Sequence, residues 1–213
     1  MRTLVFASTK GGVGKTTLSA ALAVAAVEDG ERVALIDADP QGSLEMWHAG
    51  RGNPDNPALF PARVGEKRQD VMARHAAATR SAATLCIIDT PPAMISIIEP
   101  CVRLATLCVV AVRPSPLDLT AIDPVVELCA EHEVPHLFVL NQTTPRSNYT
   151  EQAAKLLRKD GSVYDGEIVS RQSYAIAMVR GLTAPETERG NGQSREEIEA
   201  LWRSVKRRLA KAK

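Results

Sequence analysis

The feature that most constrains this chain lies near its start, where an apolar run leads straight into a glycine-rich stretch. Residues 4–7 read LVFA, and residues 9–17 read TKGGVGKTT. A strand, a tight glycine turn and a following helix bring several backbone N–H groups and the positive end of a helix to one point, which suits a polyphosphate anion. Gly11, Gly12 and Gly14 let the backbone approach the phosphates without an intervening Cβ. The pattern therefore predicts a phosphate-binding loop.

Two side chains of this loop have predictable tasks. Lys15 supplies a positive charge for the outer phosphates, and the hydroxyl of Thr16 can coordinate Mg²⁺. The usual pattern G-x-x-x-x-G-K-[ST] would place glycine at position 9, where this chain has Thr9. A second lysine, Lys10, stands at the start of the loop instead. One lysine inside the loop is enough for the outer phosphates, so Lys10 is either a solvated loop residue or has a separate task.

Two further apolar runs end in carboxylates. Residues 33–36 read VALI and precede Asp37 and Asp39, and residues 85–88 read LCII and precede Asp89. Acids at the carboxyl ends of parallel strands lie at the ligand-binding edge of an open α/β sheet. Taken singly, an acid after a strand is usually a helix cap or turn residue. Beside a phosphate-binding loop, all three become candidate site residues.

Taken together, these motifs resemble the ParA/MinD family of ATPases. The modified loop K-G-G-x-G-K-[ST]-T of that family is matched at every position from Lys10 to Thr17. DADPQG at 37–42 resembles the family's D-x-D-P-Q-G segment, and DTPP at 89–92 resembles the end of its Walker B strand. RPSPLD at 113–118 and RQSY at 171–174 are similar to the small ParA/ParF-type partition ATPases. The resemblance covers nearly the whole chain and is loosest after residue 141.

The resemblance implies ATP and Mg²⁺ as cofactors and assigns roles to particular residues. Catalysis would rest on Lys15, on Asp39, which would orient the attacking water, and on Lys10, which would reach across a homodimer to the partner's phosphates. Asn141 would contact the adenine, although an asparagine after a strand is also a common turn residue. Magnesium would be held by Thr16, Asp37 and Asp89. The residues expected to bind the nucleotide are Lys10, Gly11, Gly12, Val13, Gly14, Lys15, Thr16, Thr17 and Asn141.

The spacing of apolar runs predicts the fold. Such runs recur at 2–7, 32–37, 84–89, 107–112 and 136–141, and helices are expected between them at 16–29, 65–80, 94–105, 118–132 and 150–160. By composition, 50–62 is expected to be a loop. A chain of 213 residues, with 45% hydrophobic and only 4% aromatic residues, can bury one full core. We therefore predict a single P-loop ATPase domain over 1–213, with a mostly parallel twisted α/β sheet flanked by helices on both faces.

The C-terminal segment 194–213 is predicted to be a closing basic amphipathic helix. Ser194 and Glu197 have capping-box spacing. Apolar residues follow at helical spacing, at positions 198, 201, 202, 205 and 209. Residues 203–213 contain six basic residues and no acid, so the remaining 20 basic and 25 acidic residues leave 1–202 with a net charge of −5. The net charge of +1 therefore conceals a polarised molecule.

Three interpretations of this basic tail remain open. The helix could dock through its apolar face and leave a solvated basic face. The basic face could instead contact DNA phosphates without reading sequence, and the resemblance implies nucleoid DNA as a matrix. A MinD-like membrane helix is disfavoured, because Trp202 is the only aromatic residue in the segment and basic charge alone attracts anionic lipid weakly. The candidate DNA contacts are Arg203, Lys206, Arg207, Arg208 and Lys211, with Arg171 and Arg180 as further choices.

The lengths of the apolar runs and the spacing of the cysteines indicate the compartment. No apolar run approaches the roughly 18 residues that span a bilayer, and the first strand begins where a signal peptide would lie. The four cysteines form no C-x-x-C pair, so reduced, packed thiols in a cytoplasmic protein are expected. There is also no room before residue 2 for a separate DNA-binding domain, so operator-specific repression is not expected.

The resemblance implies a nucleoid-associated partition ATPase. ATP would close a homodimer that binds DNA nonspecifically, and a cargo adaptor similar to ParB or ParG would stimulate an otherwise weak hydrolysis by water attack on the γ-phosphoryl group. Three alternatives stay open: positioning of a protein cargo, a VirC-like role in conjugative DNA transfer, and a MinD-like regulator at the membrane.

Overall fold

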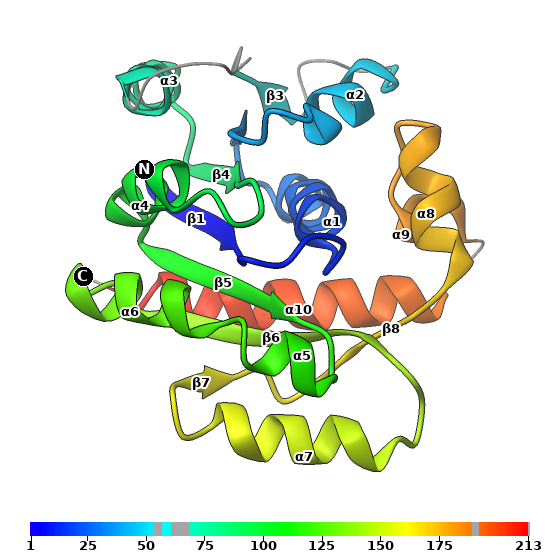
Figure 1. Cartoon of the computed structure of the whole chain (residues 1–213). Coiled ribbons are helices and arrows are strands. Elements are labelled where there is room, and N and C mark those ends of the chain that lie inside the picture. Colours follow the sequence, from blue (N-terminus) through cyan, green and yellow to red (C-terminus); the bar gives the residue numbers. More distant parts are fainter. Residues whose placement is uncertain (53–56, 61–68, 189–191, 213) are drawn as a thin grey trace.

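The computed structural model describes residues 1–52, 57–60, 69–188 and 192–212. It confirms the predicted α/β class, with a twisted sheet whose paired strands all run parallel (Figure 1). The order across the sheet is β3-β2-β4-β1-β5-β6-β7, and β8 also pairs with β6. The long strands are β1 (Arg2–Ala7), β2 (Val33–Asp37), β4 (Leu85–Asp89), β5 (Leu107–Val112) and β6 (His136–Thr143); the short ones are β3 (Ala58–Leu59), β7 (Ser162–Val163) and β8 (Ile168–Val169).

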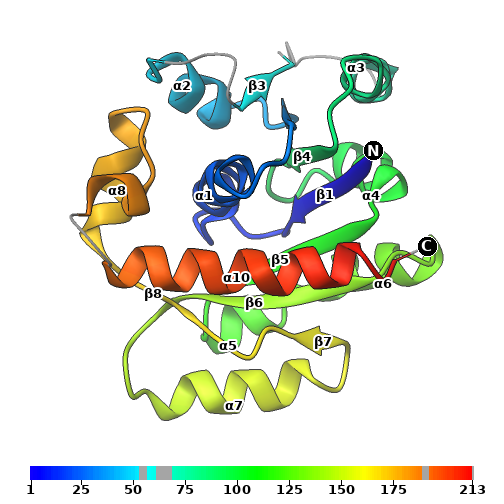
Figure 2. The same ribbon diagram turned by 180° about the vertical axis from the view of Figure 1, so that it is seen from behind.

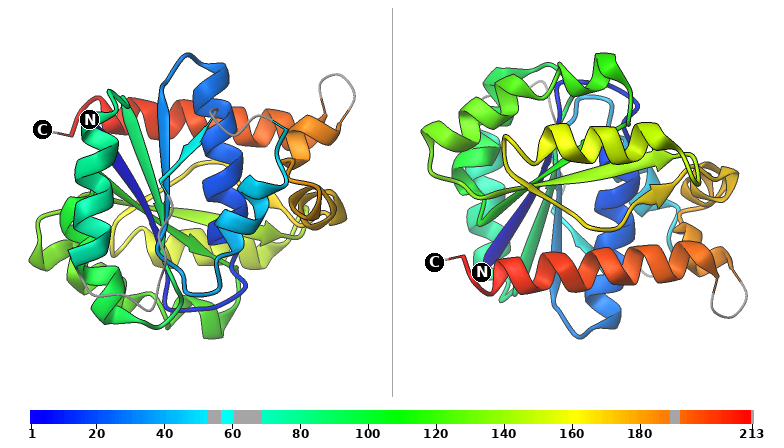
Figure 3. Two further views of the ribbon diagram at one scale, coloured as in Figure 1. Left: turned by 90° about the horizontal axis from the view of Figure 1, so that it is seen from above. Right: turned by 90° about the horizontal axis from the view of Figure 1, so that it is seen from below.

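Helices cover both faces of the sheet, as predicted, and each face has its own apolar core (Figure 3). One core packs against α1 (Lys15–Glu28), α2 (Ser43–Ala49), α8 (Gln172–Val179), α9 (Ala184–Thr187) and α10 (Gln193–Leu209). The other packs against α3 (Gln69–Arg80), α4 (Ile95–Leu104), α6 (Asp123–Glu131) and α7 (Asn148–Leu157). Because alternate residues of a strand point to opposite faces, the buried strands supply both cores at once.

The predicted helix over 118–132 is wrong in one respect, because the structure contains two helices there. A short helix, α5 (Pro116–Leu119), is capped by the Ser115 side chain, and α6 starts afresh at Asp123. Each helix has a proline in its first turn. The N–H groups of that turn have no partner within the helix, so the missing N–H of proline costs little there. Residues 50–62 were expected to form a loop, but 58–59 form the short strand β3. Residues 53–56 and 61–62 of that segment lie outside the described residues, and so do residues 65–68 of the helix expected at 65–80.

The capping box expected at Ser194 is also wrong. Helix α10 begins one residue earlier, with Gly192 as its N-cap and no side-chain cap. The backbone N–H of Ser194 donates to Glu188 at 3.1 Å, and Glu197 accepts a hydrogen bond from Arg171 instead of closing a box. A complete capping box occurs elsewhere, between Thr183 and Glu186 at the start of α9.

Helix α10 docks through its apolar face, and its basic end lies far from the phosphate-binding loop. The side chains of Trp202 and Lys206 donate to Asp29, which caps the C-terminal end of α1, at 2.8 and 2.5 Å. Because the 14 residues of α1 span about 21 Å, this contact is about that far from the loop at the other end of the helix. Figure 2 shows the C-terminal end of α10 on the same side of the molecule as the N-terminus of the chain. None of the helices in the described part of the chain is long and apolar enough to cross a membrane.

Candidate functional site

The glycine-rich loop joins β1 to α1 at the carboxyl edge of the sheet (Figure 1). Gly12 and Gly14 have φ angles of 72° and 90°, which a side chain would strain. Gly14 also has no room for one, because an added Cβ would lie 2.2 Å from Nδ2 of Asn141. Gly14 is the N-cap of α1 and offers no side-chain acceptor, so the first N–H groups of a 14-residue helix face the loop uncapped. This backbone fits a bound polyphosphate.

Lys15 is the buried cation of the loop. Its residue is only 6% exposed, and its Nζ donates to the backbone oxygen of Lys10 at 3.1 Å. Burial lowers the pKa of Lys15, while the charges of Asp89 and Asp39 act in the opposite direction. An ammonium has three protons to donate. Its position at the base of the loop suits phosphate oxygens as acceptors.

Asp89 is fully buried beneath the same loop. It accepts hydrogen bonds from Thr16 Oγ1 at 2.6 Å and from Ser19 Oγ at 3.3 Å. Burial raises the pKa of Asp89 to about 7. Ser19 was missed in the sequence, although its position one turn after Thr16 places both hydroxyls on the same face of α1.

Asp37 is equally buried and holds the start of α2. One carboxylate oxygen accepts from the backbone N–H groups of Leu44 and Glu45 at 2.9 and 3.0 Å, and the other accepts from Asp39 N at 3.0 Å. Burial raises the pKa of Asp37, and these hydrogen bonds oppose that rise. The carboxylate of Asp39 caps the backbone N–H of Gln41 at 2.9 Å and is only partly buried.

The oxygen atoms gathered here fit Mg²⁺. This ion prefers hard oxygen ligands and commonly takes one or two from protein, with phosphate oxygens and waters completing its shell. Thr16 and Asp89 lie within hydrogen-bond distance of one another. Asp37, whose oxygens already accept three backbone N–H groups, is suited to an outer position through water. In the described part of the chain, no group of three or more His, Cys, Asp or Glu side chains could hold a metal on its own.

Lys10 lies at the mouth of the loop and is partly exposed. It borders a cavity of about 470 Å³ together with Arg113, Asp118 and Tyr149. The neighbouring Thr9 donates its hydroxyl proton to the backbone oxygen of Ala121. The entrance to the loop is therefore attached to the turn between α5 and α6.

Asn141 lies on the other side of the loop. Its Nδ2 donates to Val13 O at 2.7 Å, and Gln142 Nε2 donates to Gly12 O at 2.8 Å. Both residues border a cavity of about 250 Å³ that Gly14, Thr17, Arg171 and Tyr174 also line. The end of β6 is thus joined to the loop, and the cavity lies directly beside the loop.

The predicted DNA-binding residues are scattered, and several already have partners. Arg171 is only 20% exposed at its side chain, binds Glu197 at 2.7 Å and lines the smaller cavity, so it is poorly placed for DNA. Arg203 lies 3.7 Å from Glu199, Lys206 binds Asp29, and Arg208 donates to Ser204 Oγ at 2.6 Å. Of the predicted DNA-binding residues, Arg180, Arg207 and Lys211 are exposed and have no ion pair among the described residues.

The chain is similar to known proteins over nearly its whole length. The family described as the CobQ/CobB/MinD/ParA nucleotide binding domain matches residues 4–184. "Maintenance of carboxysome distribution protein A" of Halothiobacillus neapolitanus is 31% identical over 95% of this chain and 95% of its own length. "Protein ParA" of Rhizobium radiobacter is 25% identical over 100% of this chain and 99% of its own length. The solved MinD cell division protein of Aquifex aeolicus has a TM-score of 0.79 at 18% identity, covers 97% of each chain and shows the same fold.

Proposed function

We propose, on the premise that this chain belongs to the CobQ/CobB/MinD/ParA family of nucleotide-binding domains, that it is a Mg²⁺-dependent ATPase that positions a cargo in the cell. The observation that carries the proposal is the meeting of three features at one edge of the sheet. These are an uncapped helix N-terminus behind a glycine loop, the buried Lys15, and the buried carboxylates Asp37 and Asp89.

Each residue of the site has a separate task in binding or hydrolysing ATP. Backbone N–H groups of the loop and Lys15 bind the phosphates of ATP, and Asn141 lies where it can contact the base. Thr16 and Asp89 would hold Mg²⁺ with Asp37 behind them, and the bound ion would offset the negative charge of the outer phosphates. Asp39, nearer the surface, orients the attacking water. Phosphoryl transfer needs mainly positioning and charge stabilisation, which this arrangement supplies.

A homodimer formed in the presence of ATP is the second part of the proposal. Ten large apolar side chains are exposed among the described residues, and four of them lie at the start of a helix that follows the carboxyl end of a strand. Exposed apolar side chains at this end of the strands suit association with a second copy. Lys10, at the mouth of the loop, can then serve the partner's phosphates. The four residues are Met94, Ile95, Leu117 and Tyr149.

Nonspecific DNA binding, and with it nucleoid association, is the third part. Arg180, Arg207 and Lys211 are the strongest candidates because they are exposed and lack ion pairs among the described residues. Arg203 and Lys206 can also contribute, since an exposed ion pair is worth at most about 1 kcal/mol and phosphates can compete for it. Arg208 can contribute by exchanging its hydrogen bond to Ser204 for one to a phosphate. Two subunits that meet at the loop edge would carry their basic tails at the outer ends of the dimer. Dimerisation would therefore spread the phosphate contacts along a duplex.

Two kinds of cargo suit this machinery, in each case through an adaptor that stimulates hydrolysis. Partition of DNA is supported by the full-length similarity to a protein named ParA. Distribution of a protein cargo is supported by the similarity, at 31% identity, to a protein named for maintaining carboxysome distribution. A membrane role has less support, because the apolar face of α10 is buried against the body of the protein.

The direct test is release of phosphate from ATP by the purified protein, with and without Mg²⁺. Wild-type protein should show slow turnover that requires Mg²⁺, and Lys15→Ala should abolish it. Lys155→Ala, which changes an exposed lysine on α7, is the matched control and should hydrolyse ATP as the wild type does. Turnover that survives Lys15→Ala would place hydrolysis elsewhere.

A further inference from the structure

Helix α2 is attached at its N-terminal end to the acids of the site. Asp37 accepts hydrogen bonds from Leu44 N and Glu45 N in the first turn of α2, and Asp39 lies in the connection between β2 and this helix. Helix α2 has only seven residues, so it cannot define its own direction firmly. Asp37 itself is held in β2, so whatever fixes the far end of α2 acts on the segment between them, which carries Asp39.

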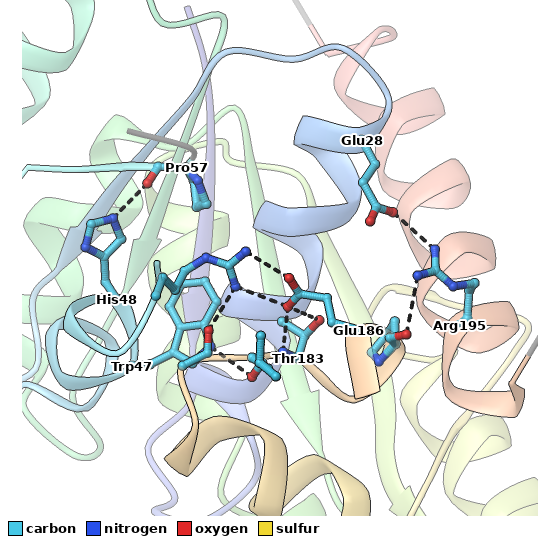
Figure 4. Close-up of polar contacts among 11 residues, drawn as sticks. Glu28, Trp47, His48, Pro57, Thr183, Glu186 and Arg195 are labelled. Carbon is cyan, nitrogen blue, oxygen red and sulfur yellow. Dashed lines mark hydrogen bonds and ion pairs between the residues drawn. The ribbon is translucent and has the colours of Figure 1, made fainter. Parts of the chain in front are cut away.

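The far end of α2 is fixed by Arg51. The guanidinium of Arg51 donates to both carboxylate oxygens of Glu186, at 2.9 and 3.1 Å, and to Gly181 O at 3.0 Å. It lies 4.8 Å from the centre of the Trp47 ring, and Trp47 donates its indole N–H to Leu182 O at 3.0 Å. Figure 4 shows Trp47, Thr183 and Glu186 meeting at this joint.

The joint is well shielded, and its geometry is specific. The side chains of Arg51 and Glu186 are 12% and 20% exposed. Burial alone would raise the pKa of Glu186, but hydrogen bonds from Arg51 and Thr183 hold it below its usual range, so the carboxylate is ionised near neutral pH. Two-pronged pairing with a carboxylate needs the planar guanidinium of arginine, and lysine cannot reproduce it.

The backbones at the joint are in direct contact. Gly181 has a φ of 68°, and a Cβ added there would lie 2.3 Å from the carbonyl carbon of Gly50. A Cβ on Gly50 would lie 3.2 Å from Cα of Gly181. Neither residue can change without moving α2 relative to the 181–186 segment.

The 181–186 segment leads back to the cavity beside the loop. It follows α8 directly, and Tyr174 and Ala175 of α8 line the cavity that Gly14 and Asn141 also border. A continuous path of contacts therefore connects the carboxylates at one side of the loop with the cavity wall at the other. It runs from Asp37 through α2 and the Arg51–Glu186 pair to α8.

We propose that Arg51 and Glu186 are positioning residues for ATP hydrolysis: they hold α2, and with it the connection that carries Asp39, in register with the wall of the nucleotide cavity. The inference rests on the proposed ATPase function. Neither residue touches the loop, so the pair acts through α2. A displacement of about 1 Å at a reacting group can lower a rate by as much as about 100-fold.

The test separates turnover from binding. Arg51→Met keeps most of the stem but removes the fork, and Glu186→Gln keeps the shape but removes the charge. We expect each to lower kcat by at least about 10-fold, while affinity for a fluorescent ATP analogue changes less than about 3-fold. The double variant should be little worse than either single one, because both remove one interaction. Arg51→Lys should have a kcat nearly as low as that of Arg51→Met, because lysine cannot form the two-pronged pair with Glu186.

The control is a similar ion pair at the amino-terminal end of the central strand β1. Arg2 pairs with Glu31 at 2.6 Å, and the two side chains are 32% and 11% exposed. Arg2→Met should lower the melting temperature without changing kcat at a temperature well below melting. If Arg51→Met and Glu186→Gln fold, judged by circular dichroism, and hydrolyse ATP at the wild-type rate, the positioning role is overturned while the ATPase proposal stands.

A spectroscopic readout tests the path itself. Trp47 and Trp202 are the only two tryptophans, so Trp202→Phe leaves Trp47 as the sole indole. ATP should change Trp47 emission in that background, and adding Arg51→Met should reduce the change. An ATP response that Arg51→Met leaves unaltered would contradict the coupling. Absence of hydrolysis by the wild type would instead overturn the ATPase proposal, and the inference with it.

Discussion

Asp37 and Asp89 stand directly opposite one another at the carboxyl ends of the neighbouring parallel strands β2 and β4. Hydrogen-bonded strands lie about 4.8 Å apart, so the pairing places two buried carboxylates close together beneath the phosphate-binding loop. Burial raises the pKa of both, which indicates a site that gains from a nearby positive charge. Lys15 supplies part of that charge, and the oxygen ligands suit Mg²⁺ for the rest.

Asp39→Ala should separate nucleotide binding from hydrolysis. The carboxylate of Asp39 bonds only to Gln41 N among the described groups and leaves the phosphate contacts of the loop untouched. The variant should therefore bind ATP and Mg²⁺ within about 3-fold of wild type, lose at least about 100-fold in kcat and accumulate as an ATP-bound dimer. Light scattering in saturating ATP provides the measurement. A variant that stays monomeric there would assign Asp39 to metal binding or folding.

Asn141→Ala should weaken both the loop and base selection. Loss of the hydrogen bond to Val13 O costs about 0.5–1.5 kcal/mol, so ATP affinity should fall up to roughly 10-fold. If Asn141 also contacts adenine, the preference for ATP over GTP should narrow. Competition of GTP against a fluorescent ATP analogue measures this. Gln142→Ala, which removes the neighbouring bond to Gly12 O, is the control and should leave the preference unchanged. An unaltered preference in Asn141→Ala would remove it from base recognition.

Arg207→Glu combined with Lys211→Glu should weaken binding to all duplexes alike. Each phosphate contact contributes about −0.9 to the slope of log affinity against log salt, so two lost contacts per subunit should flatten it by roughly 2 units per subunit. Binding to two unrelated duplexes at several salt concentrations, with ATP and with ADP, gives both quantities. Arg80→Glu, on the exposed end of α3, is the control. Wild-type DNA binding by the double variant would mean that α10 only docks and leaves its basic face to solvent.

Glu186→Gln should destabilise the protein most at neutral pH. The pKa of Glu186 lies below the ordinary value of 4.5 in the folded protein, so its ionised form adds stability above that pH. This stability is lost as pH falls through the folded pKa, because the carboxylate is then protonated in both states. The free energy of unfolding in urea should therefore differ between variant and wild type more at pH 7 than at pH 3.5. An equal difference at both values would show that Glu186 contributes shape alone.

The phosphate-binding loop and the three acids could be predicted because each is encoded by residues adjacent in sequence. The five long strands were equally visible, since a buried parallel strand is a continuous apolar run. Helices α2, α8 and α9 were missed because they have seven, eight and four residues and no long amphipathic pattern. Such short helices depend on tertiary contacts for their stability.

The remaining features depend on residues far apart in the chain. Glu197 has the spacing for a capping box, but Arg171, 26 residues earlier, binds its carboxylate. The Arg51–Glu186 joint connects positions 135 residues apart, and the local capping box that contains Glu186 gives no sign of its pairing with Arg51. The position of the basic tail is likewise set by the docking of α10 along α1. Local sequence spacing contains none of this information.

Dimerisation driven by ATP is tested by the mass of the protein in light scattering with ATP and Mg²⁺, together with its nucleotide affinity. The proteins compared are wild type, Lys10→Ala and Lys15→Ala. Lys15 is buried inside the loop and Lys10 lies at its mouth. Wild type should double its mass with ATP, and Lys15→Ala should lose nucleotide binding. Lys10→Ala should bind ATP as a monomer but neither dimerise nor hydrolyse it. Equal loss of ATP affinity in both variants, or a wild type that remains monomeric in saturating ATP, would contradict the proposed dimerisation.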